Sequence, residues 1–450
     1  MQGSDGAVTT LSGWGRTPRA DCPVVRPRTA DAVTVPGIAT ARDSISRGMG
    51  RAYGDSALNR NAVIDMRGLS RFLAFDPVTG LLVAEAGAVL ADIIAAVLPR
   101  GWFMPVVPGT SFVTLGGMIA ADVHGKNHHG AGSIGQHVAW LDLLTPDGKV
   151  VRCSQGEQPD LFALTIGGMG LTGPILRAAV RLMPVETGWI RQIQIAAPDL
   201  DAALAAFEDH LASRYSVAWI DCLASGRALG RSLITLGDHA TVAELPEAQR
   251  VRPFAVPARR RLTVPMDAPS WLLNGLSVKA FNALYHARGL RALGDSLVPW
   301  DRYFHPLDAV LHWNRIYGRQ GFCQFQCVLP LATARAGLVQ LLEAIAAAGT
   351  GSFLAVLKRM GPQAGMLSFP MEGYTLALDF PARPRPLALL DRLDRIVIDH
   401  GGRFYLAKDA RMPRDVLHAS DPRAAAFRAR REALGLVSHF ASLQSERLGL

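Results

Sequence analysis

The first 185 residues alternate short strand-like segments with turns rich in glycine and proline, and this pattern restricts the folds open to the chain. Residues 71–87 have the pattern strand, Pro/Gly turn, strand, and residues 137–154 that of a hairpin whose turn is Pro146-Asp147-Gly148. Helical apolar spacing occurs in short stretches, at 88–101 and 160–166. This order of elements predicts an α+β fold.

The pattern changes near residue 185, where we place a domain boundary. Amphipathic helices are predicted at 199–214 and 333–349, among strands at 216–222 and 323–330. Residues 250–300 show no regular pattern and are expected to be irregular. Because a chain of 450 residues exceeds what one hydrophobic core usually serves, we expect two domains, divided near 185.

The formal net charge is +9, with arginine far outnumbering lysine. A basic balance is compatible with nucleic acid, anionic lipid or a phosphorylated ligand. The positive charge is scattered and no aromatic-plus-basic binding motif occurs, so nucleic acid is not expected as a partner. A phosphate-bearing ligand is also compatible with the positive charge and does not require a nucleic-acid-binding motif.

Cysteine usage and hydropathy bear on the compartment. The five cysteines form no CxxC pair, and Cys323 and Cys327 share one face of a predicted strand, which favours reduced, packed thiols. Residues 1–17 lack the charged and apolar regions of a secretory signal, and no run of eighteen apolar residues occurs. We therefore expect a cytoplasmic protein without a membrane span.

One glycine motif, "GMGLTG" at 168–173, has the spacing G-x-G-x-x-G of dinucleotide-binding folds. That fingerprint must follow a strand, open a helix and precede an acidic residue by about twenty positions. Here it follows a predicted helix and leads into a strand that begins at Pro174. A nicotinamide-binding Rossmann domain is therefore not predicted.

Two other glycine loops fit the binding of a pyrophosphate better. "SRGMGRAYGDS" (46–56) follows a strand, and in "PVVPGTSFVTLGGMIAAD" (105–122) Thr114 precedes two glycines that open a helix of small residues. Backbone N–H groups without side chains in front of them are well suited to anionic oxygens. Each loop alone is a weak signal, because glycine loops are usually plain turns.

The segment "HGKNHH" (124–129) concentrates His124, Lys126, His128 and His129, which raises the hypothesis of a metal site. Zinc requires ligands at fixed spacing and an Asp, Glu or Cys that completes its coordination. No downstream partner motif occurs, so we expect no metal. A metal-binding hydrolytic protein that uses the three histidines remains a remote alternative.

The motifs, taken in order, resemble the FAD-binding domain of the vanillyl-alcohol oxidase/p-cresol methylhydroxylase (PCMH) family, and within it flavoproteins that oxidise a polyprenyl-phosphoryl ribose. The resemblance rests on "LSGWGRT" (11–17), the two glycine loops, "HGKNHH", "GGMGLTG", "HPLD" (305–308), "WNRIYG" (313–318), "SFLAVLK" (352–358), "LSFP" (367–370), "DFP" (379–381) and "GGRFYLAKDAR" (401–411). It implies a PCMH-type FAD-binding domain over 1–185, to which 401–450 returns. It also implies a substrate (cap) domain over 186–400, with an antiparallel sheet and flanking helices that roofs the flavin.

The same resemblance implies which residues bind FAD. They are Arg47, Gly48, Gly50, Arg51, Tyr53, Gly54, Pro108, Gly109, Thr110, Thr114, Gly116, Gly117, Asp122, His124, Gly125, Lys126, Asn127, Gly170, Thr172, Gly173, Tyr405 and Lys408. Many relatives tether the flavin through a histidine in the motif R-G-x-G-H, where this chain has Arg51. A guanidinium stays protonated and cannot form that bond, so we expect non-covalent FAD.

For the chemistry, the resemblance implies hydride transfer from a secondary alcohol to the flavin. The catalytic candidates are Lys408, His124 and Tyr405, with Lys408 first because it matches a lysine that reaches both flavin and substrate. His128 and His129 can be packing residues. On the substrate side the resemblance implies Trp219, Arg315, Gln324, Gln326, Lys358 and Thr375.

The chain departs from the pattern of these polyprenyl-phosphoryl-ribose-oxidising flavoproteins at the substrate pocket. Ala377 stands in place of a cysteine, Thr375 in place of an asparagine and Met360 in place of a phenylalanine, and Tyr303-Phe304 reverses an aromatic pair. These changes spare the flavin contacts and alter the pocket. They affect the identity of sugar and lipid more than the redox class.

The segment 259–286 combines three arginines with Trp271, Leu272, Leu273 and Phe281. A loop seldom exposes that much apolar surface. Three interpretations stay open: a mobile lid, a surface that receives a polyprenyl phosphate at the bilayer, and an ordinary covered loop.

Three functions are therefore considered. The leading one is FAD-dependent oxidation of the 2′-hydroxyl of a polyprenyl-phosphoryl-β-D-ribose to a 2′-keto intermediate, the first half of an epimerisation in arabinan (cell-wall) synthesis. Its implied partners are a quinone-like electron acceptor, a reductase of the short-chain dehydrogenase type and, peripherally, the inner membrane. The second is a soluble sugar or alditol oxidase of the same fold that uses oxygen, and the third is the metal-binding hydrolytic protein.

Overall fold

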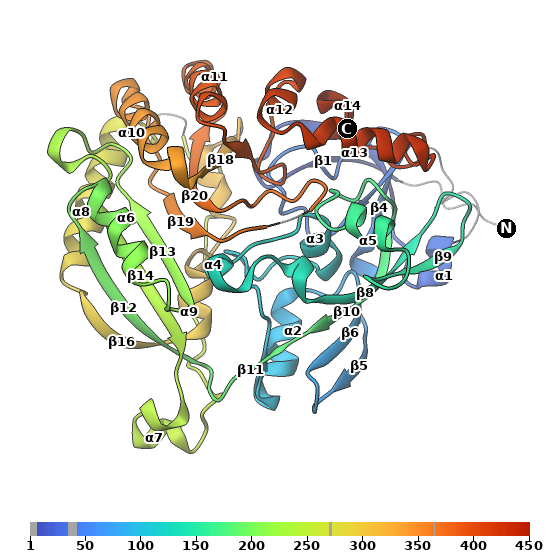
Figure 1. Ribbon diagram of the computed structural model, residues 1–450, viewed down its shortest axis with the longest axis horizontal. Helices are drawn as coiled ribbons and strands as arrows, with labels where there is room; N and C mark the ends of the chain where they lie inside the picture. The colour runs from blue at the N-terminus through green and yellow to red at the C-terminus, as the bar shows by residue number, and fades with distance from the viewer. Residues whose placement is uncertain (1–6, 35–42, 270–271, 364) are drawn as a thin grey trace.

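The computed structural model describes residues 7–34, 43–269, 272–363 and 365–450 (Figure 1). Its N-terminal half contains a small sheet of four strands in the order β1-β2-β4-β3. Pairing is antiparallel between β1 and β2 and parallel on both sides of β4. These strands are β1 (Ala7–Ser12), β2 (Arg19–Val25), β3 (Ser44–Arg47) and β4 (Ala62–Asp65), with α1 (Ala30–Thr34) between β2 and β3.

A second, antiparallel sheet of five strands has the order β5-β6-β10-β8-β9. The strand pairs predicted at 71–87 and 137–154 are confirmed as β5 (Phe72–Asp76) with β6 (Leu81–Glu85) and β8 (Val138–Leu144) with β9 (Val150–Cys153). β10 (Ile175–Arg181) lies between them, and β7 (Trp102–Phe103) pairs with β11 (Met183–Pro184). The helices of this part are α2 (Leu90–Val97), α3 (Leu115–Ala120), α4 (His128–Ala131) and α5 (Pro159–Thr165). As predicted, "GMGLTG" follows a helix, α5, and precedes a strand, β10.

The rest of the chain is built on one antiparallel sheet of eight strands, in the order β16-β12-β14-β13-β19-β20-β18-β21. In chain order the strands are β12 (Trp189–Ala197), β13 (Tyr215–Ile220), β14 (Ser232–His239), β16 (Gly294–Pro299), β18 (Phe322–Pro330), β19 (Ala355–Met360), β20 (Gly373–Pro381) and β21 (Arg403–Phe404). Helices α6 (Leu200–Asp209), α10 (Leu331–Ala348) and α11 (Pro384–Asp399) pack on this sheet, as seen on the left and at the top of Figure 1. The helices predicted at 199–214 and 333–349 are thus confirmed as α6 and α10.

Within the described part of the chain, α10 alone has the length and apolar composition of a membrane-spanning helix. Seven of its residues are buried, among them Leu338, Leu341 and Ile345, and it contacts β18, β20, α6 and α11. The helix therefore packs as part of the core behind the sheet.

The expectation that residues 250–300 are irregular is wrong. Helix α7 (Glu247–Arg250) ends where this region begins. The region itself contains β15 (Leu262–Thr263), the sixteen-residue helix α8 (Gly275–Leu290), β16 and the start of α9 (Trp300–Phe304). The side chain of Asn274 caps α8 by accepting hydrogen bonds from the backbone N–H groups of Leu276 and Ser277. Only Val278, Asn282 and Gly289 of α8 are buried, so its apolar residues do not form the single buried stripe that periodicity detects. Trp271 lies outside the described residues.

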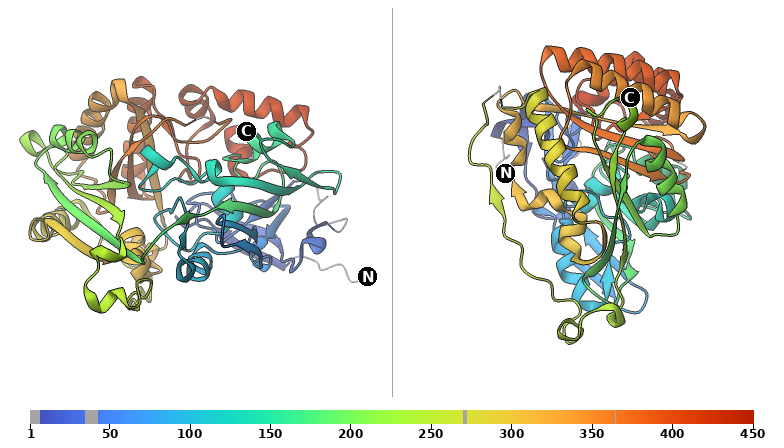
Figure 2. Two further views of the ribbon diagram at one scale, coloured as in Figure 1. Left: turned by 60° about the horizontal axis from the view of Figure 1, so that its bottom comes forward. Right: turned by 90° about the vertical axis from the view of Figure 1, so that its left-hand side faces the viewer.

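The C-terminal residues return to the first sheet as helices α12 (Arg414–Ser420), α13 (Arg423–Ala433) and α14 (Leu443–Leu448). Phe440 forms a parallel bridge with Ser44, and the backbone N–H of Leu443 donates to the carbonyl of Leu58 at 2.9 Å. Arg447 forms an ion pair of 2.7 Å with Asp55 in the glycine loop that follows β3. Figure 2 shows these red helices above the blue N-terminal strands.

Candidate active site

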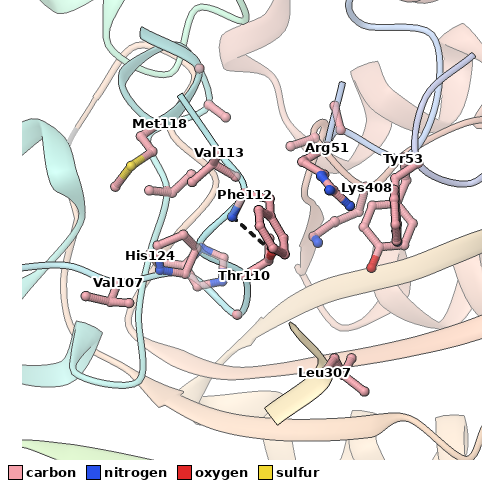
Figure 3. Close-up of a pocket in the computed structure, with 18 of the residues that line it drawn as sticks. Arg51, Tyr53, Val107, Thr110, Phe112, Val113, Met118, His124, Leu307 and Lys408 are labelled. Atoms are coloured by element: carbon pink, nitrogen blue, oxygen red, sulfur yellow. Dashed lines mark hydrogen bonds between the residues drawn. The ribbon is translucent and has the colours of Figure 1, made fainter. Parts of the chain in front are cut away.

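A cavity of about 840 Å³ lies between the eight-stranded sheet and the two glycine loops. The loops contribute residues from Ser46 to Ala57 and from Val107 to Lys126. Across from them, alternate residues of β12, β13, β18 and β19 face the cavity, as side chains on one face of a sheet must. Figure 3 shows Arg51, Tyr53 and Lys408 on one side of the pocket and His124 on another.

The two glycine loops touch each other at the base of the cavity. A β-carbon on Gly48 would lie 2.2 Å from Oγ1 of Thr114, and Gly50 has a φ of +62°, so both positions need glycine. The hydroxyl of Thr114 accepts a hydrogen bond from the N–H of Gly117 at 3.3 Å and thereby caps α3. The loops therefore present bare backbone to the cavity, as a phosphate cradle requires.

Arg51 is held by aromatic rings. Its guanidinium carbon lies 4.0 Å from the ring centroid of Trp14 and 5.2 Å from that of Phe112. Both aromatic residues line the cavity. Arg51 thus occupies the wall of the cavity as a fixed cation and not as a solvated loop charge.

Several buried polar atoms of the lining have no protein partner. Among the described residues these include Oγ of Ser46, Nε of Arg51 and Nδ1 of His124. Buried polar groups are nearly always hydrogen-bonded, so these atoms indicate a polar ligand. The volume is also within the range of about 300–1,000 Å³ typical of cofactor sites. The residues present therefore fit FAD, which supplies a hydride acceptor when bound.

His124 lies where the cofactor side of the cavity meets the sheet. Its Nε2 is 3.1 Å from Nε2 of Gln326, whose amide also donates to Oγ1 of Thr375 at 3.2 Å. Because the amide nitrogen is a donor, Nε2 of His124 is the acceptor and Nδ1 carries the proton. Burial and the nearby Lys358 hold the pKa of His124 well below its usual value. His124 is therefore a neutral hydrogen-bond donor.

Most of the few lysine residues of this chain line the cavity. Three of the five lysines, Lys126, Lys358 and Lys408, line the cavity. Burial lowers the pKa of Lys126 and of Lys358 to about 7, in each case with a contribution from a neighbouring lysine. An amine with such a pKa can give up its proton near neutral pH, whereas an arginine cannot.

Lys408 differs from the other two because a carboxylate balances it. Burial lowers its pKa and Asp379 raises it, with a result of about 8. The ammonium lies 4.1 Å from the ring centroid of Tyr53. Gln324 donates from its amide nitrogen to Asp379 at 2.6 Å and to the hydroxyl of Tyr53 at 3.3 Å. Asp379 is itself buried, and burial raises its pKa to about 7.

Comparison with known proteins agrees with this site. Residues 24–154 match a family model described as an FAD binding domain. The chain is 36% identical, over 98% of its length and 97% of the relative's, to decaprenylphosphoryl-β-D-ribose oxidase of Mycolicibacterium smegmatis. The chain belongs to the decaprenylphosphoryl-β-D-ribose oxidase family. It is an FAD-dependent oxidoreductase of the α+β class with a PCMH-type FAD-binding domain, as the sequence resemblance implied.

Two further relatives of this chain tell less about its function. An uncharacterized protein of Streptomyces coelicolor is 38% identical over 79% of this chain and 98% of its own. Cytokinin dehydrogenase 5 of Arabidopsis thaliana is 29% identical over 41% of this chain and 36% of its own. The latter match covers less than half of either chain.

The structure brings most of the sequence-predicted residues together at one cavity. Lining it are Gly48, Gly50, Arg51, Tyr53, Pro108, Gly109, Thr110, Thr114, Gly116, Gly117, His124, Gly125, Lys126, Gly170, Gly173, Trp219, Gln324, Gln326, Lys358, Tyr405 and Lys408. Tyr405 stacks on Phe369 and donates its hydroxyl to the carbonyl of Ala121 at 3.0 Å. Burial holds the pKa of Tyr405 well above its usual value, so this hydroxyl is neutral near pH 7.

Seven predicted site residues do not line the cavity. Arg47 donates to the carbonyl oxygens of Ser12 and Ala57, and Arg315 to those of Val264 and Pro265. The resemblance implies ligand contacts for both arginines, whereas here their guanidinium groups hydrogen-bond to carbonyl oxygens of neighbouring loops. The others lie behind the lining: Gly54 against Asp409, Asp122 bonded to Gly135 and Gln363, Asn127 to Pro105, Thr172 to Thr165, and Thr375 to Gln326 and Cys327.

The other two histidines of "HGKNHH" serve packing. Nδ1 of His128 accepts from the backbone N–H of Gly361 at 3.1 Å, and Nε2 of His129 donates to the carbonyl of Ser213 at 2.8 Å. In the described part of the chain, no group of three or more His, Cys, Asp or Glu side chains is arranged to hold a metal ion.

Sequence reasoning missed two acidic residues that shape the site. Asp308 accepts from the hydroxyl of Thr110 at 2.7 Å and from the backbone N–H of Ser111 at 2.8 Å, which ties the second glycine loop to the segment that follows α9. Asp379 acts on Lys408, as described above. Both belong to matched motifs, "HPLD" and "DFP", so the signal was present but carried no role.

Proposed function

We propose that this protein oxidises the 2′-hydroxyl of a polyprenyl-phosphoryl-β-D-ribose to a 2′-ketone. One observation supports it above all: the polar side chains of His124, Gln324, Gln326, Lys358 and Lys408 line the same cavity as the two glycine loops. The relative that covers nearly the whole chain carries decaprenylphosphoryl-β-D-ribose in its name. Bound FAD would supply the acceptor for the hydride of C2′, and a base of the protein takes the hydroxyl proton.

Lys408 is the base in this proposal. With a pKa of about 8 it is partly neutral near pH 7 to 8, where its amine can take the hydroxyl proton. The ammonium that results is balanced by Asp379 and stabilises negative charge on the reduced cofactor. The Nδ1–H of His124 is placed to donate a hydrogen bond to the sugar or the flavin. The two amide protons of Gln326 go to His124 and Thr375, so Gln326 can only accept a hydrogen bond from the ligand, through its carbonyl oxygen.

The FAD is non-covalent in this proposal, because Arg51 occupies the tethering position and lies against Trp14. Acid precipitation tests it: the flavin should remain in the supernatant. Flavin that stays with the precipitated polypeptide would show a covalent bond.

The ketone needs a further reaction. A reductase of the short-chain dehydrogenase type that returns a hydride to C2′ from the other face would complete the epimerisation to the arabinose donor. The reduced FAD would pass its electrons to a quinone-like acceptor. The protein would work in the cytoplasm, peripherally at the inner membrane where its lipid-linked substrate lies.

Anaerobic titration of the holoenzyme tests the substrate and the acceptor. A short-chain polyprenyl-phosphoryl ribose should bleach the flavin, and a quinone should restore its colour faster than oxygen does. Bleaching by free alditols or sugars with rapid reoxidation by oxygen would instead show an oxygen-using sugar oxidase of the same fold.

A further inference from the structure

Helix α8 carries an apolar face that the protein itself does not cover. Its buried residues, Val278, Asn282 and Gly289, lie on one side of the helix and pack towards the eight-stranded sheet. With 3.6 residues per turn, the opposite side is formed by positions four, seven, eight, eleven and fourteen after Leu276. All of these positions are apolar and exposed: Leu276, Ala280, Ala283, Leu284, Ala287 and Leu290, which we call the outer stripe.

The outer stripe is strongly exposed to solvent although all its residues are apolar. The residues Leu276 and Leu284 are 79% and 71% accessible. Ten of the eighteen large apolar side chains that are exposed in the described part of the chain lie between Val251 and Leu293. The right-hand view of Figure 2 looks onto α8, the long yellow helix that crosses the near face. A continuous apolar surface of this kind marks a site of contact with another phase or molecule.

Positive charge borders the stripe. Lys279 and Arg288 lie on its two sides along the helix, and Arg291 follows directly after α8. From Arg252 to Gly294 the chain has seven basic residues and one acidic residue, Asp267, whose carboxylate is paired with Arg16. An apolar face with lysine and arginine on its flanks complements an anionic lipid surface, since the long basic side chains reach the headgroups while the leucines enter the acyl region.

The other side of α8 leads into the cavity. Phe281 stacks against Tyr285 with 5.8 Å between ring centroids, and Tyr285 lies 4.8 Å from Trp219. Tyr285 and Trp219 both line the cavity. A lipid chain that leaves a bilayer at the outer stripe would therefore meet a continuous aromatic path to the reaction site.

We propose that the outer stripe of α8 docks the protein on the surface of an anionic lipid bilayer, so that a lipid-linked substrate enters the cavity past Phe281 and Tyr285. The docking rests on the geometry of α8, and the route of entry rests on the proposed function. The helix lies in the plane of the interface with its axis along the membrane, as amphipathic surface helices do.

The test uses the FAD-loaded full chain and vesicles of phosphatidylglycerol mixed with phosphatidylcholine. In flotation, the wild type should bind these vesicles and bind pure phosphatidylcholine at least about tenfold less, because the headgroup charge is absent. Raising the NaCl concentration from about 0.1 M to about 1 M should weaken binding, since the Debye length falls from about 10 Å to about 3 Å. A wild-type protein that does not float with the anionic vesicles would overturn the proposal.

The double variant Leu276→Glu/Leu284→Glu should bind the anionic vesicles at least about tenfold more weakly, since two charges then face the acyl region. Glutamate is a good helix former, so α8 is retained. The matched control is Val78→Glu/Leu434→Glu, which makes the same change at exposed apolar residues on other elements. Equal binding of the two double variants would overturn the proposal, as would a wild-type dimer that becomes a monomer in Leu276→Glu/Leu284→Glu without lipid.

A second readout separates this inference from the proposed function. In Leu276→Glu/Leu284→Glu, kcat/KM should fall for a long-chain substrate held in vesicles and stay unchanged for a water-soluble short-chain analogue. If neither substrate is oxidised by the wild type while vesicle binding remains, the proposed function is wrong and the docking surface is not. If both substrates are oxidised equally by the wild type and the variant, the route of entry is wrong.

Discussion

Replacing Lys358 by methionine should stabilise the protein at neutral pH. Burial and Lys408 lower the pKa of Lys358 from 10.5 to about 7. Each pH unit of such a difference corresponds to about 1.4 kcal/mol, so the full cost to folding at pH 7 is about 4 kcal/mol. Because Lys358 faces the cavity, solvent screens part of this cost, and we expect Lys358→Met to raise the free energy of unfolding by about 2 kcal/mol.

The pH dependence of the gain distinguishes this cause from simple repacking. The folded-state pKa lies below that of the unfolded chain, so the cost is complete below about pH 7 and disappears as the pH rises towards about 10.5. The difference between Lys358→Met and wild type should thus be large at pH 7 and small at about pH 9.5. Urea denaturation of both proteins with excess FAD, followed by tryptophan fluorescence, measures it.

Lys149→Met is the matched control, because Lys149 is an exposed lysine whose side chain is 77% accessible and pairs with Asp147. Its free energy of unfolding should change by no more than about 0.5 kcal/mol at either pH. A loss of stability in Lys358→Met at pH 7, or a gain that persists unchanged at high pH, would refute the reasoning. The first result would mean that Lys358 is charged and paired in the folded protein.

Three further predictions concern the chemistry of the cavity. Lys408→Met should slow anaerobic flavin reduction by about 10²- to 10⁴-fold, the usual contribution of a general base, while FAD absorbance is retained; bleaching at the normal rate would exclude Lys408 as the base. Asp379→Asn removes the charge that raises the pKa of Lys408, so the acid limb of the pH–rate profile should shift to lower pH by about one unit or more. The control Asp391→Asn changes an exposed carboxylate and should leave the acid limb in place. The native protein should resist labelling by iodoacetamide, because all five thiols are buried and burial raises the pKa of Cys222 and Cys327 to about 12. The variant Ala377→Cys should gain one label, because position 377 lines the cavity. The intact mass of wild type and variant after treatment decides both points.

Periodicity predicted the elements whose apolar residues face one core. The strand pairs at 71–87 and 137–154 were found because a turn signal separates two alternating runs. Helix α8 was missed because Leu276 and Leu284 face outwards while Val278 faces the sheet. Apolar residues on two opposite faces of a helix give no helical period, so hydrophobic periodicity does not predict a helix of this kind.

The motif resemblance predicted most of the residues that line the cavity, and it also included residues that lie behind the lining. The glycine loops and Lys408 lie at the cavity because their backbone or amine is what the cofactor side requires. Arg47 and Arg315 come from the same resemblance, yet the partners of their guanidinium groups are carbonyl oxygens of the protein, which only the folded chain reveals. Asp379 accepts a hydrogen bond from Gln324, which lies 55 residues earlier in the chain. These two residues meet because of the register between β18 and β20, which the sequence alone does not reveal.

The return of the C-terminal helices has a consequence for the order in which the protein can be made. Asp55, in the first glycine loop, pairs with Arg447, which is synthesised 392 residues later. The strand edge at Ser44 likewise waits for Phe440. Although domains generally fold as they leave the ribosome, the first sheet emerges here with a buried carboxylate unpaired and an edge uncovered. The first glycine loop is therefore among the first parts of the chain to be translated and among the last to be completed, so we expect FAD capture to be a late step of biogenesis.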